Sequence, residues 1–199
     1  MILKGFNDLS AFLETPKNVV IVGHRNPDGD AIGASLALKH YLTKKGHHAT
    51  VVMPNDYPDF LQWLPGSENT FCFDWQNSQS QKAIQKSEII FLLDFNTLHR
   101  VGSDMQNTLE KYQNDFVMID HHQQPDDVKF MYSDVNVCST SQMIYQYIEM
   151  NNDLSLIDKD IATCLYTGIM TDTGSFRFRS TTSKTHRIIA DLIDKGAQN

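Results

Sequence analysis

Three apolar segments of this chain run directly into acidic and histidine side chains, and this arrangement constrains the fold more than any other feature. Residues 19–22 lead into His24, Asp28 and Asp30, residues 89–93 lead into Asp94, and residues 116–119 lead into Asp120, His121 and His122. Short apolar runs are typical of buried strands, and open parallel sheets place their active sites beyond the carboxyl ends of such strands. We therefore expect these polar groups to converge at one edge of a sheet.

The pattern between and after these segments predicts a regular alternation of strands and helices. Strands are expected over residues 19–22, 49–53, 71–73, 88–93 and 116–119, and helices over residues 31–45, 58–64, 78–86, 103–112, 139–150, 158–170 and 183–195. Strands separated by helices indicate a doubly wound, largely parallel α/β sheet flanked by helices. The C-terminal third is predicted to be helical.

Length and composition limit the class of protein. A chain of 199 residues suits one domain, and a net charge of −7 argues against a surface that binds polyanions in general. The three cysteines form neither a CxxC pair nor an even disulfide framework, and no apolar run is long enough to span a bilayer. We therefore expect a reduced, cytoplasmic protein without a membrane partner, whose cysteines are buried as small apolar side chains.

The segment from His24 to Asp30 is predicted to be a tight loop that enters a helix. Pro27 and Gly29 break regular structure, so the imidazole and both carboxylates can turn toward one point. The start of the following helix could also hold phosphate through backbone N–H groups, but the pattern is neither GxGxxG nor a Walker loop. Metal binding explains the three side chains better; the alternative is that Asp30 only caps the helix.

Two further acids are ambiguous when each is considered alone. Asp94 could be a helix cap or a turn former, and Asp172, in the segment 171–174, could belong to a helix-ending turn closed by Gly174. The position of Asp94 at the same sheet edge as His24 and Asp120 favours a role in the site. A carboxylate and two imidazoles behind a buried strand are costly unless a cation or a reaction uses them.

These residues resemble the four signature motifs of the DHH phosphoesterases. The matching segments, in the order and approximate spacing of that family, are His24-Arg25-Asn26-Pro27-Asp28-Gly29-Asp30, Asp94, Asp120-His121-His122 and Thr171-Asp172-Thr173-Gly174-Ser175. The resemblance spans nearly the whole chain. It is greatest to the oligoribonuclease and adenosine 3′,5′-bisphosphate phosphatase branch, which is also described as exopolyphosphatase-related; RecJ-type exonucleases and family II pyrophosphatases are more distant.

The resemblance implies a dinuclear metal site, usually containing manganese. It places His24 and Asp28 on one ion, Asp30, His121 and Asp172 on the other, and Asp94 between both. The donor chemistry agrees, because mixed imidazole and carboxylate ligands suit Mn²⁺ better than Ca²⁺. Two divalent cations would also cancel the four carboxylate charges, and they would supply an activated water as the nucleophile.

The resemblance also assigns roles to residues beside the metals. His122 would bind the phosphoryl group or assist the leaving group, and Asp120 would orient an imidazole from behind. Arg100 could hold a substrate phosphate or brace a strand-end carboxylate, and both alternatives stay open. The alternation of Arg177 and Arg179 with phenylalanines is more typical of a half-buried edge strand than of a phosphate-binding surface.

We therefore expect a metal-dependent phosphohydrolase that acts on short single-stranded oligonucleotides or on small nucleotide phosphates such as adenosine 3′,5′-bisphosphate. The alternatives are an inorganic pyrophosphatase or exopolyphosphatase, and a catalytically idle nucleotide-binding regulatory module. Nothing in the sequence resembles the glycine-rich C-terminal substrate-binding domain of the family, so residues 1–199 are expected to form the catalytic domain alone. A homodimer is one possible assembly.

Overall fold

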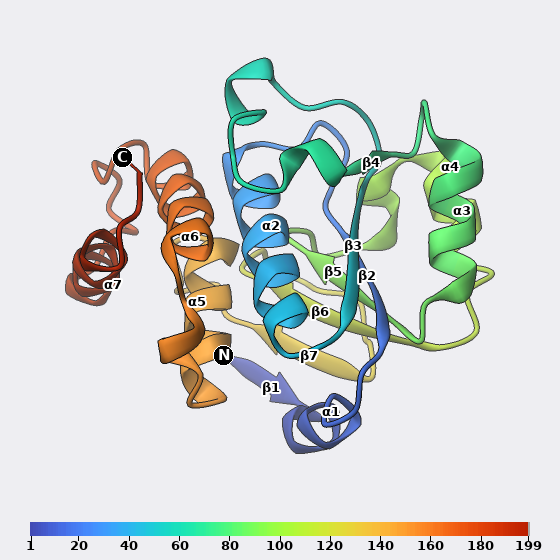
Figure 1. Ribbon diagram of the computed structural model, residues 1–199, viewed down its shortest axis with the longest axis horizontal. Coiled ribbons are helices and arrows are strands. Elements are labelled where there is room, and N and C mark those ends of the chain that lie inside the picture. Colours follow the sequence, from blue (N-terminus) through green and yellow to red (C-terminus); the bar gives the residue numbers. More distant parts are fainter. Residues whose placement is uncertain (199) are drawn as a thin grey trace.

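Seven strands form a single sheet in the computed structural model, which describes residues 1–198 (Figure 1). They are β1 (Ile2–Lys4), β2 (Asn18–Val22), β3 (His48–Met53), β4 (Phe71–Cys72), β5 (Ile89–Leu93), β6 (Asp115–Asp120) and β7 (Phe130–Ser133). Their order across the sheet is β1-β7-β6-β5-β2-β3-β4, and every neighbouring pair is parallel except β1 with β7. The prediction of a largely parallel α/β sheet is confirmed.

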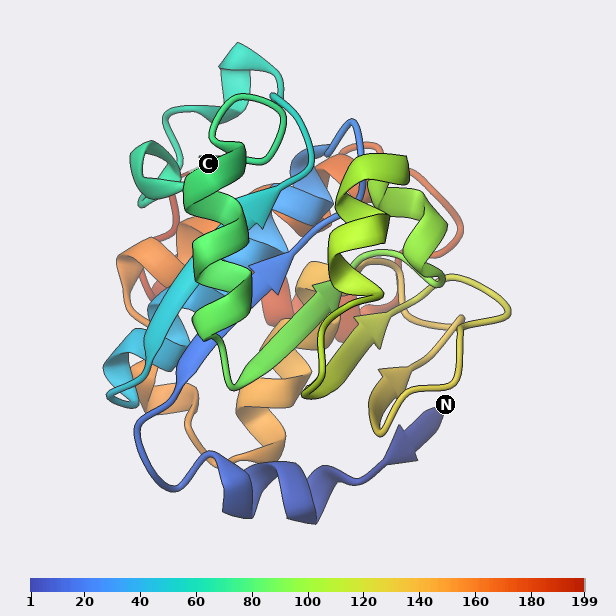
Figure 2. The ribbon, with the colours of Figure 1, turned by 90° about the vertical axis from the view of Figure 1, so that its right-hand side faces the viewer.

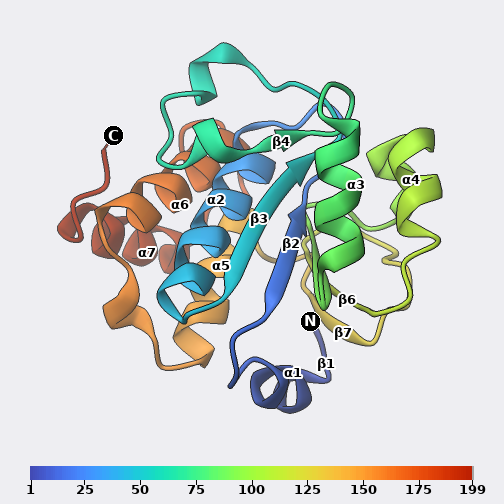
Figure 3. The same ribbon diagram turned by 45° about the vertical axis from the view of Figure 1, so that its right-hand side comes forward.

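Helices cover both faces of this sheet. They are α1 (Phe6–Phe12), α2 (Gly29–Lys44), α3 (Asn77–Lys86), α4 (Ser103–Leu109), α5 (Thr140–Met150), α6 (Lys159–Asp172) and α7 (Ser183–Asp194). Single 3₁₀ turns are η1 (Asp59–Leu61), η2 (Ser67–Asn69), η3 (Leu98–Val101) and η4 (Leu154–Leu156). Helices α3 and α4 lie on one face, whereas α2, α5 and α6 lie on the other, with α7 packed on α5 and α6 (Figure 3).

Successive side chains of each strand point to opposite faces of the sheet, and this divides the core into two layers. In β2, Val19 and Ile21 belong to the apolar cluster beneath α2, α5 and α6, whereas Val20 and Val22 belong to the cluster beneath α3 and α4. The other central strands, β5 and β6, divide their side chains in the same way. Because both faces of these strands are buried, their sequences are continuous apolar runs, which is why they could be predicted.

Helices α2 and α6 approach one another closely through two glycines. A Cβ atom on Gly33 would lie 2.5 Å from the carbonyl oxygen of Cys164, and one on Gly168 would lie 2.9 Å from Oδ1 of Asp30 and closer still to Ser141. Neither contact is sterically allowed. The absent side chains therefore allow α6 to pack against the start of α2, which brings the end of α6 to the edge where β2 and β5 finish.

The order of connections changes direction between β2 and β5. From β2 the chain crosses to β3 and β4, and from β5 it crosses to β6 and β7. In open α/β sheets a ligand crevice forms at such a switch point, beyond the carboxyl ends of the strands. The loops that follow β2, β5 and β6 therefore meet there.

The structure adds elements that the sequence pattern did not predict. Strand β1 pairs with β7 at one edge of the sheet (Figure 2), and α1 follows β1; none of the three was predicted. The helix predicted over residues 58–64 is reduced to the single turn η1.

Cys138 and Cys164 are buried as predicted, and Cys72 is half-buried. Within residues 1–198, no helix is both long enough and apolar enough to cross a membrane.

Candidate metal centre

The backbone holds the imidazoles of His24 and His121 so that both Nε2 atoms face carboxylates. Nδ1 of His24 lies 2.9 Å from the carbonyl oxygen of Arg25, and Nδ1 of His121 lies 3.2 Å from that of Val137. Because a carbonyl oxygen can only accept, each Nδ1 carries a proton, and the neutral ring keeps its lone pair on Nε2. Both rings therefore present Nε2 as a potential metal ligand.

Asp94 lies between these two rings. It follows β5 with a backbone φ of 65°, which is unusual for a residue other than glycine, and its side chain is buried. Its Oδ2 atom lies 3.5 Å from Nε2 of His24, and its Oδ1 atom lies 3.5 Å from Nε2 of His121. The carboxylate of Asp94 thus turns one oxygen toward each imidazole, although the two rings follow different strands.

Helix α2 begins with two acids that have different surroundings. Asp28 is the N-cap, since its Oδ1 atom accepts hydrogen bonds from the N–H groups of Asp30 at 2.9 Å and Ala31 at 3.1 Å. Asp30 is only 1 % exposed, and its two oxygens accept from the N–H groups of Thr140 at 2.6 Å and Ser141 at 2.8 Å. The alternative that Asp30 caps α2 is therefore wrong, and the start of α5 fixes its carboxylate instead.

Asp172 reaches the same place from the last residue of α6. Its Oδ2 atom lies 3.5 Å from Nε2 of His121. The helix-ending turn also exists, because the N–H group of Gly174 donates to the carbonyl oxygen of Thr171 at 3.1 Å and Gly174 has a φ of 56°. The two interpretations of this segment are compatible, since the turn is what ends α6 at the site.

Asp120 and His122 form a pair beside this cluster. The Oδ1 atom of Asp120 lies 2.6 Å from Nδ1 of His122, and its Oδ2 atom accepts from the N–H group of His122 at 3.1 Å. Asp120 is fully buried, whereas the side chain of His122 is 41 % exposed. The hydrogen bond to Asp120 raises the pKa of His122. Asp120 therefore orients His122 with Nε2 available for a ligand and favours its protonated form.

The electrostatics of the cluster show an excess of negative charge. Burial and the charges of Asp94 and Asp28 raise the pKa of Asp172 to about 6, and burial with the charge of Asp94 raises the pKa of Asp30 well above its usual range. Burial alone would lower the pKa of His121, but the adjacent carboxylate of Asp94 and the negative charges of Asp30 and Asp172 raise it to about 10. Four acids in this space therefore attract positive charge.

The positions of the donor atoms would allow these side chains to hold metal ions. Three groups have donor atoms that all lie within 4.8 Å of one another, namely His24 with Asp28 and Asp94, Asp30 with His121 and Asp172, and Asp94 with His121 and His122. Separations of 3.5 to 3.9 Å between imidazole nitrogens and carboxylate oxygens exceed the usual N–H···O distance. These separations are close to the distance between two ligand atoms that bind the same metal ion, each about 2.0–2.2 Å from it.

The basic residues do not converge on the cluster in the same way. Within residues 1–198, the exposed guanidinium of Arg100 has no hydrogen bond or ion pair, so it braces no strand-end carboxylate. The edge strand predicted around Arg177 and Arg179 is also wrong, because Ser175 and Phe176 have φ values of 59° and 65° and the segment forms turns. In these turns Nε of Arg177 donates to the carbonyl oxygen of Gly174 at 2.7 Å.

Two residues that support the site were not predicted from the sequence. Thr140 and Ser141 hold Asp30 through their backbone N–H groups, and the hydroxyl group of Thr140 donates to Oδ1 of Asp94 at 2.9 Å. The run Ser139-Thr140-Ser141 at the start of a predicted helix was the available signal, but such a run is equally typical of an ordinary helix cap.

Comparison with known proteins establishes the family. Residues 18–169 match the model described as "DHH family, N-terminal domain". The chain belongs to the DHH family. Its Asp-His-His triplet is Asp120, His121 and His122, the segment in which one imidazole faces Asp94 and the other is bound by Asp120.

Several relatives cover most of this DHH domain. A bifunctional oligoribonuclease and PAP phosphatase NrnA from Thermus thermophilus is 33% identical over 90% of this chain and 51% of its own length. A probable enzyme of the same name from Streptococcus mutans is 29% identical over 96% and 57%. A probable manganese-dependent inorganic pyrophosphatase from Streptococcus equi subsp. equi is 27% identical over 88% and 55%.

A solved structure agrees closely with the fold. The crystal structure of an exopolyphosphatase-related protein from Bacteroides fragilis has a TM-score of 0.93 and 36% sequence identity, covering 97% of this chain and 57% of that chain. The present chain thus spans little more than half the length of the relatives it matches.

Proposed function

We propose that this DHH domain is the catalytic part of a metal-dependent phosphohydrolase that cleaves phosphoester bonds in short oligonucleotides or in small nucleotide phosphates such as adenosine 3′,5′-bisphosphate. The observation that carries the proposal is the position of Asp94, with one carboxylate oxygen 3.5 Å from His24 and the other 3.5 Å from His121. A carboxylate shared in this way suits a pair of cations rather than a single ion.

Two divalent cations, most suitably Mn²⁺, would be held by six side chains. His24 and Asp28 would bind one ion, Asp30, His121 and Asp172 would bind the other, and Asp94 would bind both. When bound, such a pair lowers the pKa of a water molecule and neutralises charge on the phosphoryl oxygens. The names of the relatives support hydrolysis of phosphate esters or anhydrides, and one of them includes manganese.

His122 is proposed to act on the substrate directly. Its Nδ1 is bound to Asp120 at 2.6 Å, so the protonated ring has one N–H group left, on Nε2, and the side chain is 41 % exposed. A charged donor there can bind a non-bridging phosphoryl oxygen or give its proton to the leaving oxygen. Asp120 keeps the ring in one orientation and stabilises its positive charge.

Substrate binding is proposed to need more than the residues of this chain. Within residues 1–198 the guanidinium of Arg100, on η3, has no hydrogen bond or ion pair. The carbonyl oxygen of Arg100 accepts from the N–H group of Arg25 at 2.8 Å, which ties η3 to the His24 loop. We assign the guanidinium to a substrate phosphate. The chain spans little more than half the length of these relatives, and we propose that residues 1–199 bind metal yet hydrolyse short oligonucleotides poorly by themselves.

The test is a substrate panel with Mn²⁺ on the chain and on any longer parent protein. The panel contains an RNA dinucleotide, adenosine 3′,5′-bisphosphate, a cyclic dinucleotide and pyrophosphate, with Asp94→Ala as the inactive control. Release of mononucleotide from the dinucleotide, or of phosphate from the bisphosphate, supports the proposal. Turnover of pyrophosphate alone would assign an inorganic pyrophosphatase, and tight nucleotide binding by the parent protein without turnover would assign a regulatory module.

A further inference from the structure

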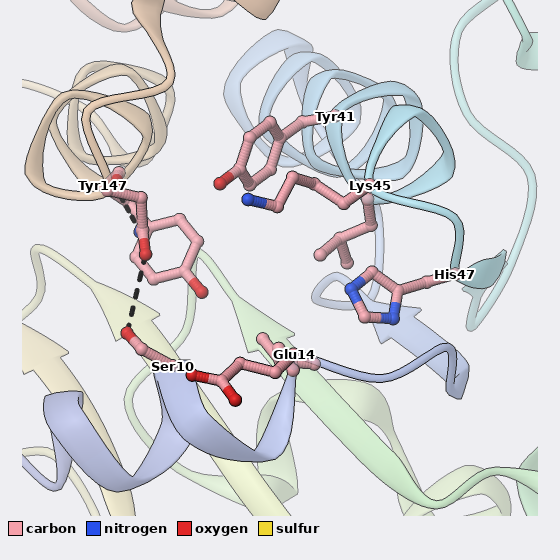
Figure 4. A pocket seen from close by; sticks show the side chains of 9 residues that line it. Ser10, Glu14, Tyr41, Lys45, His47 and Tyr147 are labelled. Atoms are coloured by element: carbon pink, nitrogen blue, oxygen red, sulfur yellow. Dashed lines mark hydrogen bonds between the residues drawn. The ribbon is translucent and has the colours of Figure 1, made fainter.

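Figure 4 shows a second pocket. It lies where α2 ends and β3 begins, at the opposite end of the sheet from the metal centre. It has a volume of about 280 Å³, is partly open to solvent, and is lined by residues of α1, the end of α2, α5 and His47 before β3. The N-cap of α2, Asp28, is at the metal centre and its C-cap, Lys45, is at this pocket, and the 16 residues between them correspond to a length of roughly 24 Å. The pocket is therefore separate from the site described above.

His47 contributes a buried hydrogen-bond donor that has no partner. The N–H group of Lys17 donates to Nδ1 of His47 at 3.1 Å, so Nδ1 is an acceptor and the proton of the neutral ring is on Nε2. His47 is 3 % exposed, and its Nε2 atom has no hydrogen-bond partner within residues 1–198. Figure 4 shows the nitrogen on the far side of the ring from the backbone turned into the pocket.

The neutral form of His47 is favoured by its surroundings. Burial and the charges of Lys45 and Lys17 lower the pKa of His47, against an opposing effect of Glu88. A buried donor without a partner is costly and rare, because native proteins satisfy nearly all such groups. The arrangement is therefore typical of a site in which a ligand supplies the missing acceptor.

The other polar groups of the pocket disfavour an anionic ligand. The ammonium group of Lys45 is already bound to Asp153 at 2.8 Å, and the hydroxyl group of Tyr41 donates to the same carboxylate at 2.6 Å. Glu14 lines the pocket from the α1 side, and its carboxylate has no hydrogen bond or ion pair within residues 1–198. The one uncompensated charge on the wall is thus negative and acts as a hydrogen-bond acceptor.

The remaining walls are suited to a flat, neutral ring. Tyr41 and Tyr147 line the pocket with their rings 6.2 Å apart and perpendicular, and Leu13 and Leu42 complete the apolar surface. A volume of 280 Å³ is just below the range of about 300–1,000 Å³ for small-molecule sites, so the pocket excludes large ligands. We infer that this pocket binds a nucleobase-type heterocycle, which accepts a hydrogen bond from Nε2 of His47 and offers its own N–H group to Glu14.

The inference is tested by calorimetric titration of the chain with uracil, cytosine and adenine, with acetate and inorganic phosphate as comparison ligands. One saturable site for at least one base is expected. His47→Asn keeps an acceptor in the place of Nδ1 for the N–H group of Lys17, but its side-chain NH₂ group does not reach the position of Nε2. The variant should therefore weaken binding at least tenfold. Leu13→Trp should abolish binding by filling the pocket from another element, without contact with the metal ligands.

Nuclear magnetic resonance of the unaltered chain provides a readout that no folding defect can affect. The ¹⁵N resonance of Nε2 of His47 should shift on saturation with the base, whereas Nδ1 should not. The inference is overturned if no base binds up to its solubility limit, if Leu13→Trp and His47→Asn bind the base as well as the parent chain does, or if acetate or phosphate binds in its place with the same dependence on His47.

Discussion

The hydroxyl group of Thr140 donates a hydrogen bond of 2.9 Å to Oδ1 of Asp94, the oxygen that also faces His121. Both residues are buried, and Thr140 is the first residue of α5. This bond fixes the rotation of the carboxylate, so that its other oxygen is left for the side of His24. The site therefore depends on α5 as well as on the strand ends.

Removal of this hydroxyl group should weaken metal binding without unfolding the domain. Thr140→Val keeps the backbone N–H bond to Asp30 and the side-chain shape, but leaves Asp94 free to rotate. Groups that orient metal ligands typically contribute 10–100-fold to metal affinity, so a loss of about tenfold is expected by calorimetry with Mn²⁺. Thr140→Ser retains the hydroxyl group and should bind Mn²⁺ nearly as the parent chain does; equal affinity of the valine variant would contradict the account.

His122 should contribute to turnover but not to metal binding. His122→Ala removes the N–H group proposed to face the phosphoryl oxygen, and losses of about 10²–10⁴-fold are typical for such a group. The rate of substrate hydrolysis should be measured with Mn²⁺ in whichever of the chain and its longer parent protein is more active, and the metal content should be determined on the same sample. Asp120→Asn should cause a smaller loss, because the ring remains but its charge is less favoured. Loss of one metal ion in His122→Ala would show that His122 is a ligand.

Gly168→Ala should destabilise the domain and disturb Asp30. The added Cβ atom would overlap Ser141 and lie 2.9 Å from Oδ1 of Asp30, in a place where neither α2 nor α5 can yield easily. Overpacking of this kind costs about 1–3 kcal/mol, which urea denaturation can detect. Lys184→Ala, at an exposed position of α7, is the control and should change stability little. Unchanged stability in Gly168→Ala would mean that the helices are not as tightly packed as described.

The contribution of Asp153 to stability should decrease in acid. Burial alone would raise the pKa of Asp153, but its hydrogen bonds to Lys45 and Tyr41 lower it overall. A carboxylate whose pKa is lower in the folded state stabilises above its unfolded pKa of about 3.9, and the contribution is lost as the pH falls through the folded value. Asp153→Asn should therefore unfold at lower urea concentration than the parent at pH 7, and the gap should narrow below about pH 4. A gap that stays constant with pH would contradict this.

The sequence was informative where buried strands end in polar groups. Residues 19–22, 89–93 and 116–119 are apolar on both faces, so the strands and the convergence of His24, Asp94 and His121 could be predicted. Strand β1 could not, because it has only three residues, all exposed, and its partner β7 begins more than a hundred residues later.

Other features depend on contacts that a pattern of residue types does not encode. Asp30 is held by backbone N–H groups of α5, which any residue type except proline could supply. The alternation at residues 176–179 suggested a strand, but positive φ values at Ser175 and Phe176 fold the segment into turns beside Gly174. That Nε2 of His47 has no hydrogen-bond partner among residues 1–198 is likewise visible only once Lys17 is placed against its ring.

The number and position of bound manganese ions test the central claim most directly. Crystals of the chain grown with excess Mn²⁺ should give two anomalous peaks, one beside His24 and Asp28 and one beside His121 and Asp172, with a carboxylate oxygen of Asp94 next to each. Asp94→Ala should lose both peaks or reduce their occupancy strongly. A single peak, or no peak among these side chains at saturating Mn²⁺, would contradict a site for two cations.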